Sequence, residues 1–189
     1  AFGNILQPGD EILTTDHEYG ACDRAWKQYC VSKGVRYVRA EIPFPVPSSE
    51  EIAELIWSMV TPRTKVLFLS HITSPTAVRI PVEVLCARAR EAGIRTVVDG
   101  SHAPGHIPLD LSTLHADIYT ANCHKWMCTP KGSAFLWVSP DLQPLIPPLI
   151  VSWGNEIPTA GDGAFVDEHE YLGTRDVSPF LSVPFAIEW

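Results

Sequence analysis

An aspartate and a lysine each follow a strand-like run of this sequence, and their side chains are of types that can act together on one small molecule. Asp99 follows the run 95–98, and Lys125 ends the stretch ADIYTANCHK. An ionised carboxylate can hold a cationic nitrogen, and an amine can react with a carbonyl group. Taken singly, Asp99 could only cap the next loop, and Lys125 could be a surface lysine whose amine extends to solvent. The pair is therefore more informative than either residue alone.

The elements that would position this pair alternate between strands and helices. The β-prone runs are short, and they lie at 11–15, 35–38, 64–70, 95–98, 116–121 and 132–138. Helical spacing of apolar residues, with capping or stop signals, predicts helices at 20–33, 49–60 and 81–92. We therefore predict an α/β fold with a mostly parallel sheet and helices on both faces. The first residues resemble the end of a helix before a turn at 8–10, and residues 140–189 are expected to form proline-rich loops.

Reactive side chains of an open parallel sheet are expected just past the carboxyl ends of its strands, where loops converge on a crevice. Three polar clusters have this position, at 70–74, 99–102 and 122–125. Each histidine in them could equally be a polar residue with no catalytic part. The combined pattern nevertheless predicts that Asp99 and Lys125 face one pocket.

The composition disfavours several classes of partner. The 189 residues carry a net charge of −8 and their Lys and Arg are dispersed, so a surface for nucleic acid is not expected. The five cysteines show no CxxC spacing, which favours reduced thiols and a cytoplasmic location. No apolar run reaches the roughly 18 residues of a membrane span. We therefore expect a protein that binds neither nucleic acid nor membrane.

Two other classes of site lack their usual spacing. A metal hydrolase is a rival interpretation because several His and Cys residues lie between 102 and 128, but neither CxxC nor HExxH occurs. Glycine-rich phosphate loops of the GxGxxG or Walker type are also missing, which disfavours a nucleotide enzyme. We therefore predict no metal site.

The motifs around the candidate residues resemble those of a known enzyme family. The segments VDGSH (98–102), NCHK (122–125) and YLGTRD (171–176) are similar to motifs of the class V aminotransferases, a group of fold-type I pyridoxal phosphate (PLP) enzymes. The segment SHITSPT (70–76) resembles the isopenicillin N epimerase-like branch. The resemblance implies the large, PLP-binding domain of the fold-type I PLP-dependent transferase fold over residues 1–189. It also implies that this domain is incomplete at both ends and that the small carboxyl-terminal domain is absent.

The resemblance also implies roles for individual residues. Lys125 would form the internal aldimine with PLP and move the α-proton of an amino-acid-like substrate, Asp99 would hold the pyridine nitrogen, and His102 would lie near the phenolic oxygen. The remaining cofactor contacts would be His17 stacked on the ring, with Tyr19 as a possible substitute, Thr73 or Ser74 near the phenolic oxygen, Asn122 and His124 at the phosphate, and Thr174 at the phosphate of a partner subunit. The last contact implies a homodimer. Arg175 is either a further anion contact or a surface residue.

Several activities stay open within this resemblance. An epimerase-like enzyme comes first, a carbon–sulfur lyase or cysteine desulfurase-like enzyme second, and an aminotransferase third. A non-catalytic protein that keeps the fold as a binding or dimerisation module is an alternative of another class. The presence of both Asp99 and Lys125 argues against it, because a scaffold needs neither.

Overall fold

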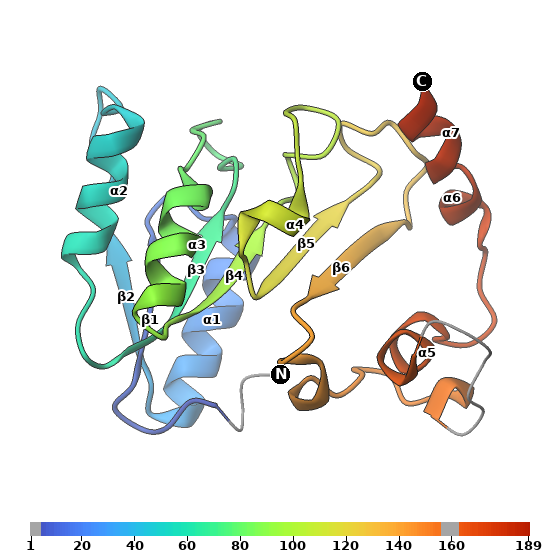
Figure 1. The fold of residues 1–189 in the computed structure, drawn as a ribbon, viewed down its shortest axis with the longest axis horizontal. Coiled ribbons are helices and arrows are strands. Elements are labelled where there is room, and N and C mark those ends of the chain that lie inside the picture. Colours follow the sequence, from blue (N-terminus) through green and yellow to red (C-terminus); the bar gives the residue numbers. More distant parts are fainter. Residues whose placement is uncertain (1–4, 156–162) are drawn as a thin grey trace.

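Six strands form one sheet in the computed structural model, which describes residues 5–155 and 163–189 (Figure 1). The strands are β1 (Glu11–Thr15), β2 (Arg36–Ala40), β3 (Thr64–Ser70), β4 (Arg95–Asp99), β5 (Ile118–Asn122) and β6 (Ala134–Val138). They lie in the order β2-β1-β3-β4-β5-β6, and only β6 runs antiparallel to its neighbour. The predicted mostly parallel sheet is therefore confirmed.

Helices cover both faces of this sheet, as predicted. On one face α1 (Gly20–Lys33) packs its Cys30 into a cluster with Val66 and Phe68 of β3. On the other face α2 (Ser49–Ser58) and α3 (Val82–Glu91) pack around Leu67 and Leu69 of the same strand. Successive residues of a strand point to opposite faces, so an apolar run such as that of β3 can serve two cores at once.

Local signals define the ends of these helices. Ser48 caps α2 in a reciprocal capping box with Glu51, as the sequence predicts. Gly34 and Gly93 follow α1 and α3, each with a φ of 67°, a left-handed conformation that glycine adopts without steric cost. The helices therefore stop where the sequence indicates, although α2 ends at Ser58 rather than at residue 60.

The order of the strands reverses direction at β1. The chain leaves β1 through α1 to reach β2 on one side, and it returns through α2 to β3 on the other side of β1. Ligands of open α/β sheets bind at such a reversal, outside the carboxyl ends of the strands. A binding site is therefore expected among the residues that follow β1, β3, β4 and β5.

The carboxyl-terminal quarter of the chain differs from the prediction of proline-rich loops. It contains the 3₁₀ turns η2 (Gln143–Leu145) and η3 (Trp153–Asn155) and the helices α5 (Ala164–Glu170), α6 (Ser178–Leu181) and α7 (Val183–Glu188). A proline occupies the first turn of both α6 and α7. Proline is tolerated there because the first N–H groups of a helix have no intrahelical partner. The prolines thus begin helices in this region.

A short helix, α4 (Leu111–Leu114), precedes β5. The helix end expected at the start of the chain falls partly on residues 1–4, which lie outside the described residues, and residues 5–10 form turns and irregular structure. None of the helices in the described ranges is long and apolar enough to cross a membrane.

Candidate active site

Asp99 is the last residue of β4, and donors from two elements hold its carboxylate. In the sheet it is in register with Ser70 of β3 and Thr120 of β5. The backbone N–H of Ser101 donates to Oδ1 at 2.9 Å, and the thiol of Cys22 on α1 donates to Oδ2 with a sulfur–oxygen distance of 3.8 Å. Burial and the nearby Asp99 raise the pKa of Cys22 to about 11, so Cys22 stays a thiol that can donate. The carboxylate is thereby oriented at the carboxyl edge of the sheet.

The residue after Asp99 packs too closely on β5 to carry a side chain. A Cβ atom at Gly100 would lie 2.1 Å from two ring carbons of Tyr119 and 2.2 Å from its hydroxyl oxygen. Tyr119 is fully buried, and its hydroxyl lies 3.0 Å from Nδ1 of His71. The position of the Asp99 loop therefore depends on a glycine packed against a buried tyrosine.

Lys125 lies in the turn after β5, and its amine contacts the loop that follows Asp99. Its Nζ is 3.3 Å from Nε2 of His102. The indole N–H of Trp126 donates to Nδ1 of the same imidazole at 3.2 Å. Cys22 lies near both residues, since the charges of Asp99 and Lys125 both act on the pKa of its thiol. The structure therefore brings Asp99, His102 and Lys125 into one cluster, as the strand-end argument predicts.

Asn122 and His124 flank the same turn. The side-chain amide of Asn122 donates to Oγ of Ser101 at 3.0 Å, which ties the loop after β5 to the loop after β4. Nδ1 of His124 is buried and has no hydrogen-bond partner within the described part of the chain. Buried polar atoms are nearly always hydrogen-bonded, so a lone one needs an explanation.

His17, the residue predicted to stack on the cofactor ring, contacts protein side chains in this structure. His17 follows β1 and is buried, and its ring stacks on Phe44 with a centroid distance of 5.4 Å. Its Nδ1 lies 2.9 Å from Oγ1 of Thr76, which in turn lies 2.8 Å from Oγ1 of Thr73. Tyr19, the possible substitute, is half exposed at the start of α1. The structure thus joins His17 to Thr73, and the identity of the stacking residue stays a prediction.

The other predicted contacts lie at the surface. Ser74 and Thr174 are exposed. The guanidinium of Arg175 lies 4.6 Å from the centre of the Phe180 ring, and it donates to the backbone carbonyl of Glu170 at 3.3 Å. The assigned roles of these residues stay predictions.

Sequence reasoning missed Glu18, whose buried carboxylate joins the ends of β1 and β3. Its Oε1 accepts a hydrogen bond from the hydroxyl of Thr15 at 2.7 Å. Its Oε2 accepts from the N–H and the hydroxyl of Ser70 at 3.0 and 2.6 Å. Burial raises the pKa of Glu18, although these donors act in the opposite direction. A carboxylate directly after a strand is a weak signal in the sequence, and a partner 52 residues away leaves none.

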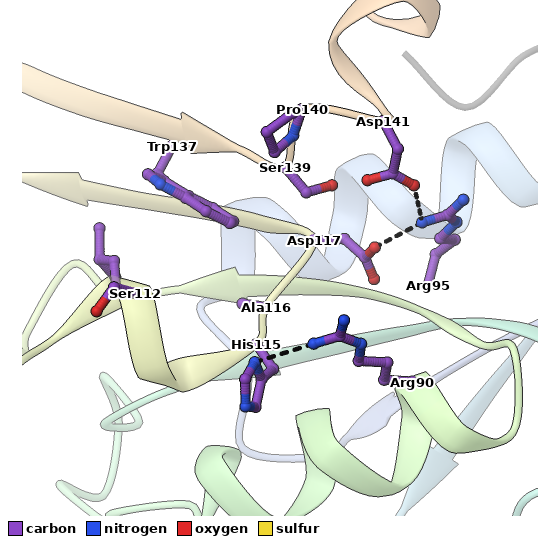
Figure 2. Close-up of a pocket in the computed structure, with 11 residues that line it drawn as sticks. Arg90, Arg95, Ser112, His115, Ala116, Asp117, Trp137, Ser139, Pro140 and Asp141 are labelled. Atoms are coloured by element: carbon purple, nitrogen blue, oxygen red, sulfur yellow. Dashed lines mark hydrogen bonds and ion pairs between the residues drawn. The ribbon is translucent and has the colours of Figure 1, made fainter.

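A polar pocket lies at the amino-terminal ends of β4 and β5 (Figure 2). There Arg95 donates to Asp117 and to Asp141, both at 2.8 Å, and Arg90 approaches His115 at 3.1 Å. Arg95 begins β4, whereas Asp99 ends it. This pocket is therefore separate from the cluster around Asp99 and Lys125.

The amino-acid sequence is similar to that of enzymes of one family. The family model described as aminotransferase class-V matches residues 1–189. The isopenicillin N epimerase of Amycolatopsis lactamdurans is 37% identical over 194 residues, which cover 97% of this chain and 49% of that protein. The putative L-cysteine desulfhydrase 1 of Oryza sativa subsp. japonica is 34% identical over 193 residues, which cover 96% of this chain and 38% of that protein. The chain thus spans about half the length of the epimerase it matches.

Solved structures show the same fold. The cystine C–S lyase C-DES, in complex with its product cysteine persulfide, superposes with a TM-score of 0.81 at 24% identity over 97% of this chain and 50% of its own. A C-DES variant with a TM-score of 0.80 carries glycine covalently linked to PLP. Since the family model spans every residue and the sheet matches these structures, the chain belongs to the aminotransferase class-V family and has the fold of the fold-type I PLP-dependent enzymes.

Proposed function

We propose that this chain forms the catalytic core of a PLP-dependent enzyme that acts on the α-carbon of an amino acid, in the manner of the isopenicillin N epimerases. One observation carries the proposal. The amine of Lys125 lies 3.3 Å from His102, and His102 shares a loop with Asp99. An amine, an imidazole and a carboxylate at the carboxyl ends of adjacent strands suit the capture and activation of a carbonyl cofactor.

The residues present fit PLP. The carboxylate of Asp99 would hold the pyridine nitrogen, and the amine of Lys125 would attach the aldehyde covalently. Nδ1 of His124, which is buried and has no hydrogen-bond partner among the described residues, and the amide of Asn122 would contact the phosphate. When bound, PLP supplies an electron sink that stabilises negative charge at the substrate's α-carbon.

The chain's own residues would then carry the proton. Once the amino group of the substrate has displaced it from the cofactor, the amine of Lys125 would remove the proton from the α-carbon, because it is the basic group of the cluster. His102 would orient that amine through Nε2. The thiol of Cys22 and the N–H of Ser101 would keep Asp99 in place. Delivery of a proton to the opposite face of the α-carbon would give the epimer.

A carbon–sulfur lyase is the second candidate. The 34% identical desulfhydrase and the structural similarity to a C–S lyase favour it, because both proteins are named for cleavage of sulfur amino acids. An aminotransferase is the third candidate. All three begin with proton transfer at the α-carbon, so the cluster around Lys125 supports each of them and does not choose.

The proposal also includes a homodimeric assembly and a cytoplasmic location. The exposed Thr174 suits a phosphate contact across the interface of a homodimer, the arrangement that the family resemblance implies. All five cysteines are free, which supports the cytoplasm as a reducing compartment. Two measurements on the full-length protein test the shared site. Sedimentation measures the oligomeric state, and the PLP affinity of Thr174→Ala, compared with that of the wild type, measures the phosphate contact.

The experiment is α-hydrogen exchange. Full-length protein with PLP is incubated in deuterium oxide with a panel of amino acids, and mass spectrometry follows both the α-hydrogen and the products. We expect exchange with one class of amino acid, together with an epimer. Pyruvate or a related keto acid with release of sulfur would indicate the lyase instead. Exchange with no substrate, or full exchange by Lys125→Ala, would contradict the proposal.

A further inference from the structure

Both ring nitrogens of His102 have a partner in the turn after β5. The indole N–H of Trp126 lies 3.2 Å from Nδ1, and Nζ of Lys125 lies 3.3 Å from Nε2. An indole nitrogen can only donate a hydrogen bond, so Nδ1 of His102 must accept. A neutral imidazole that accepts at Nδ1 carries its proton on Nε2. That proton then points at the amine of Lys125.

This arrangement selects a state of Lys125. An ammonium group has three donors and no acceptor, whereas a neutral amine has a lone pair that can accept from Nε2–H. Only the neutral amine attacks a carbonyl carbon. The hydrogen bond from Trp126 to His102 therefore favours the reactive form of Lys125 through the tautomer of the imidazole.

The indole is held where this hydrogen bond needs it. The ring of Trp126 stacks on His106 with a centroid distance of 4.2 Å and an interplanar angle of 23°. Nδ1 of His106 lies 3.1 Å from the carbonyl oxygen of His102. Gly105 lies so close to this turn that a Cβ atom there would meet the carbonyl oxygen of Trp126 at 2.6 Å. The loop 102–106 and the turn after β5 are thus packed on each other.

The charge state of the imidazole agrees with this arrangement. Partial burial lowers the pKa of His102 below its ordinary value. Among the neighbouring titratable groups, Asp99 favours the protonated form and His106 disfavours it, whereas Lys125 disfavours it only while its amine is charged. A neutral His102 with a defined tautomer is therefore the expected state.

We propose that Trp126 is a positioning residue that fixes the tautomer of His102 and so keeps the amine of Lys125 ready to capture the cofactor's aldehyde. The proposal rests on the function proposed above. In this capture the amine nitrogen bonds to the aldehyde carbon, a C=N bond replaces C=O, and the carbonyl oxygen leaves as water with both amine protons. No oxidant or further reactant is required.

The test uses the full-length protein freed of cofactor, with its histidines labelled with nitrogen-15. Nitrogen shifts distinguish a protonated from an unprotonated ring nitrogen, and the signals of His102 are identified by their loss in His102→Gln. Trp126→Phe removes the N–H but keeps an aromatic ring against His106. Trp57→Phe is the matched control, because Trp57 lies on α2 and contacts Arg88. Urea unfolding of each variant reports any loss of stability.

The second readout is the rate of covalent capture of added PLP, followed by absorbance. We expect the wild type and Trp57→Phe to show the proton of His102 on Nε2. Trp126→Phe should show a mixture of tautomers and capture PLP about threefold to tenfold more slowly, the factor that one ordinary hydrogen bond represents.

Two results would overturn the inference: a wild type with the proton on Nδ1, or a Trp126→Phe variant whose tautomer and capture rate match those of Trp57→Phe. A wild type with the expected tautomer that captures no PLP would instead refute the proposed function and leave the tautomer assignment intact.

Discussion

Replacement of Gly100 by alanine should damage both the fold and the site, because the new methyl group has no room. It would lie 2.1 Å from ring carbons of Tyr119, whereas carbon atoms in contact are usually about 3.5–4.0 Å apart. Tyr119 would have to move by more than about 1 Å, on the same contact distances. It is fully buried, it is hydrogen-bonded to His71, and its ring stacks parallel to that of Phe135 with a centroid distance of 6.2 Å. These contacts leave no free space into which the ring could shift.

The magnitude follows from two effects. Overpacking of a buried site usually costs about 1–3 kcal/mol. Loss of the hydrogen bond between Tyr119 and His71 would add about 1 kcal/mol. We therefore expect Gly100→Ala to lower the free energy of unfolding by about 2–4 kcal/mol. Because Gly100 follows Asp99 directly, the variant should also bind PLP more weakly.

Urea unfolding followed by tryptophan fluorescence measures this loss. Gly20→Ala is the matched control, since a Cβ atom there meets only the flexible end of Arg24, at 2.9 Å. Gly20 is the first residue of α1, where alanine is at least as favourable as glycine. The control should be as stable as the wild type or slightly more so. A Gly100→Ala protein as stable as Gly20→Ala would refute the packing argument.

Two further predictions concern charges near the site. Asp99→Asn should retain the fold but slow α-hydrogen exchange by orders of magnitude, because the pyridine nitrogen loses a charge-assisted hydrogen bond of about 1.5–3 kcal/mol and with it its proton; normal exchange would mean that Asp99 is only a loop cap. Burial lowers the pKa of His71, so the unfolded chain binds a proton that the folded chain does not. Stability is therefore present above the ordinary histidine pKa of about 6.5 and falls as the pH drops below it. The melting temperature should decline less between about pH 7 and pH 5 in His71→Asn than in the wild type, and an equal decline would assign the effect to other groups.

The sheet could be predicted from the sequence because its signals are local. A continuous apolar run such as that of β3 indicates a strand buried on both faces. The glycines after α1 and α3 mark helix ends, because glycine adopts a left-handed backbone without strain. The same reasoning fails for α6 and α7, because proline predicts a loop there although it stands in the first turn of each helix.

The site could be predicted only in outline. The rule that loops converge at the carboxyl ends of parallel strands correctly grouped Asp99, His102 and Lys125. It could not show that the thiol of Cys22, 77 residues earlier, donates to Asp99. Nor could it show that the indole of Trp126 donates a hydrogen bond to the ring of His102, because that contact depends on how two loops pack.

The most direct test of the account is to find the lysine that carries the cofactor. Full-length protein with PLP is reduced with borohydride, which makes the link between amine and cofactor permanent, and the digested protein is analysed by mass spectrometry. The account predicts a pyridoxyl label on Lys125, in the peptide that contains residues 123–126. A label on Lys65 or Lys131, or no label on any lysine, would contradict the central claim.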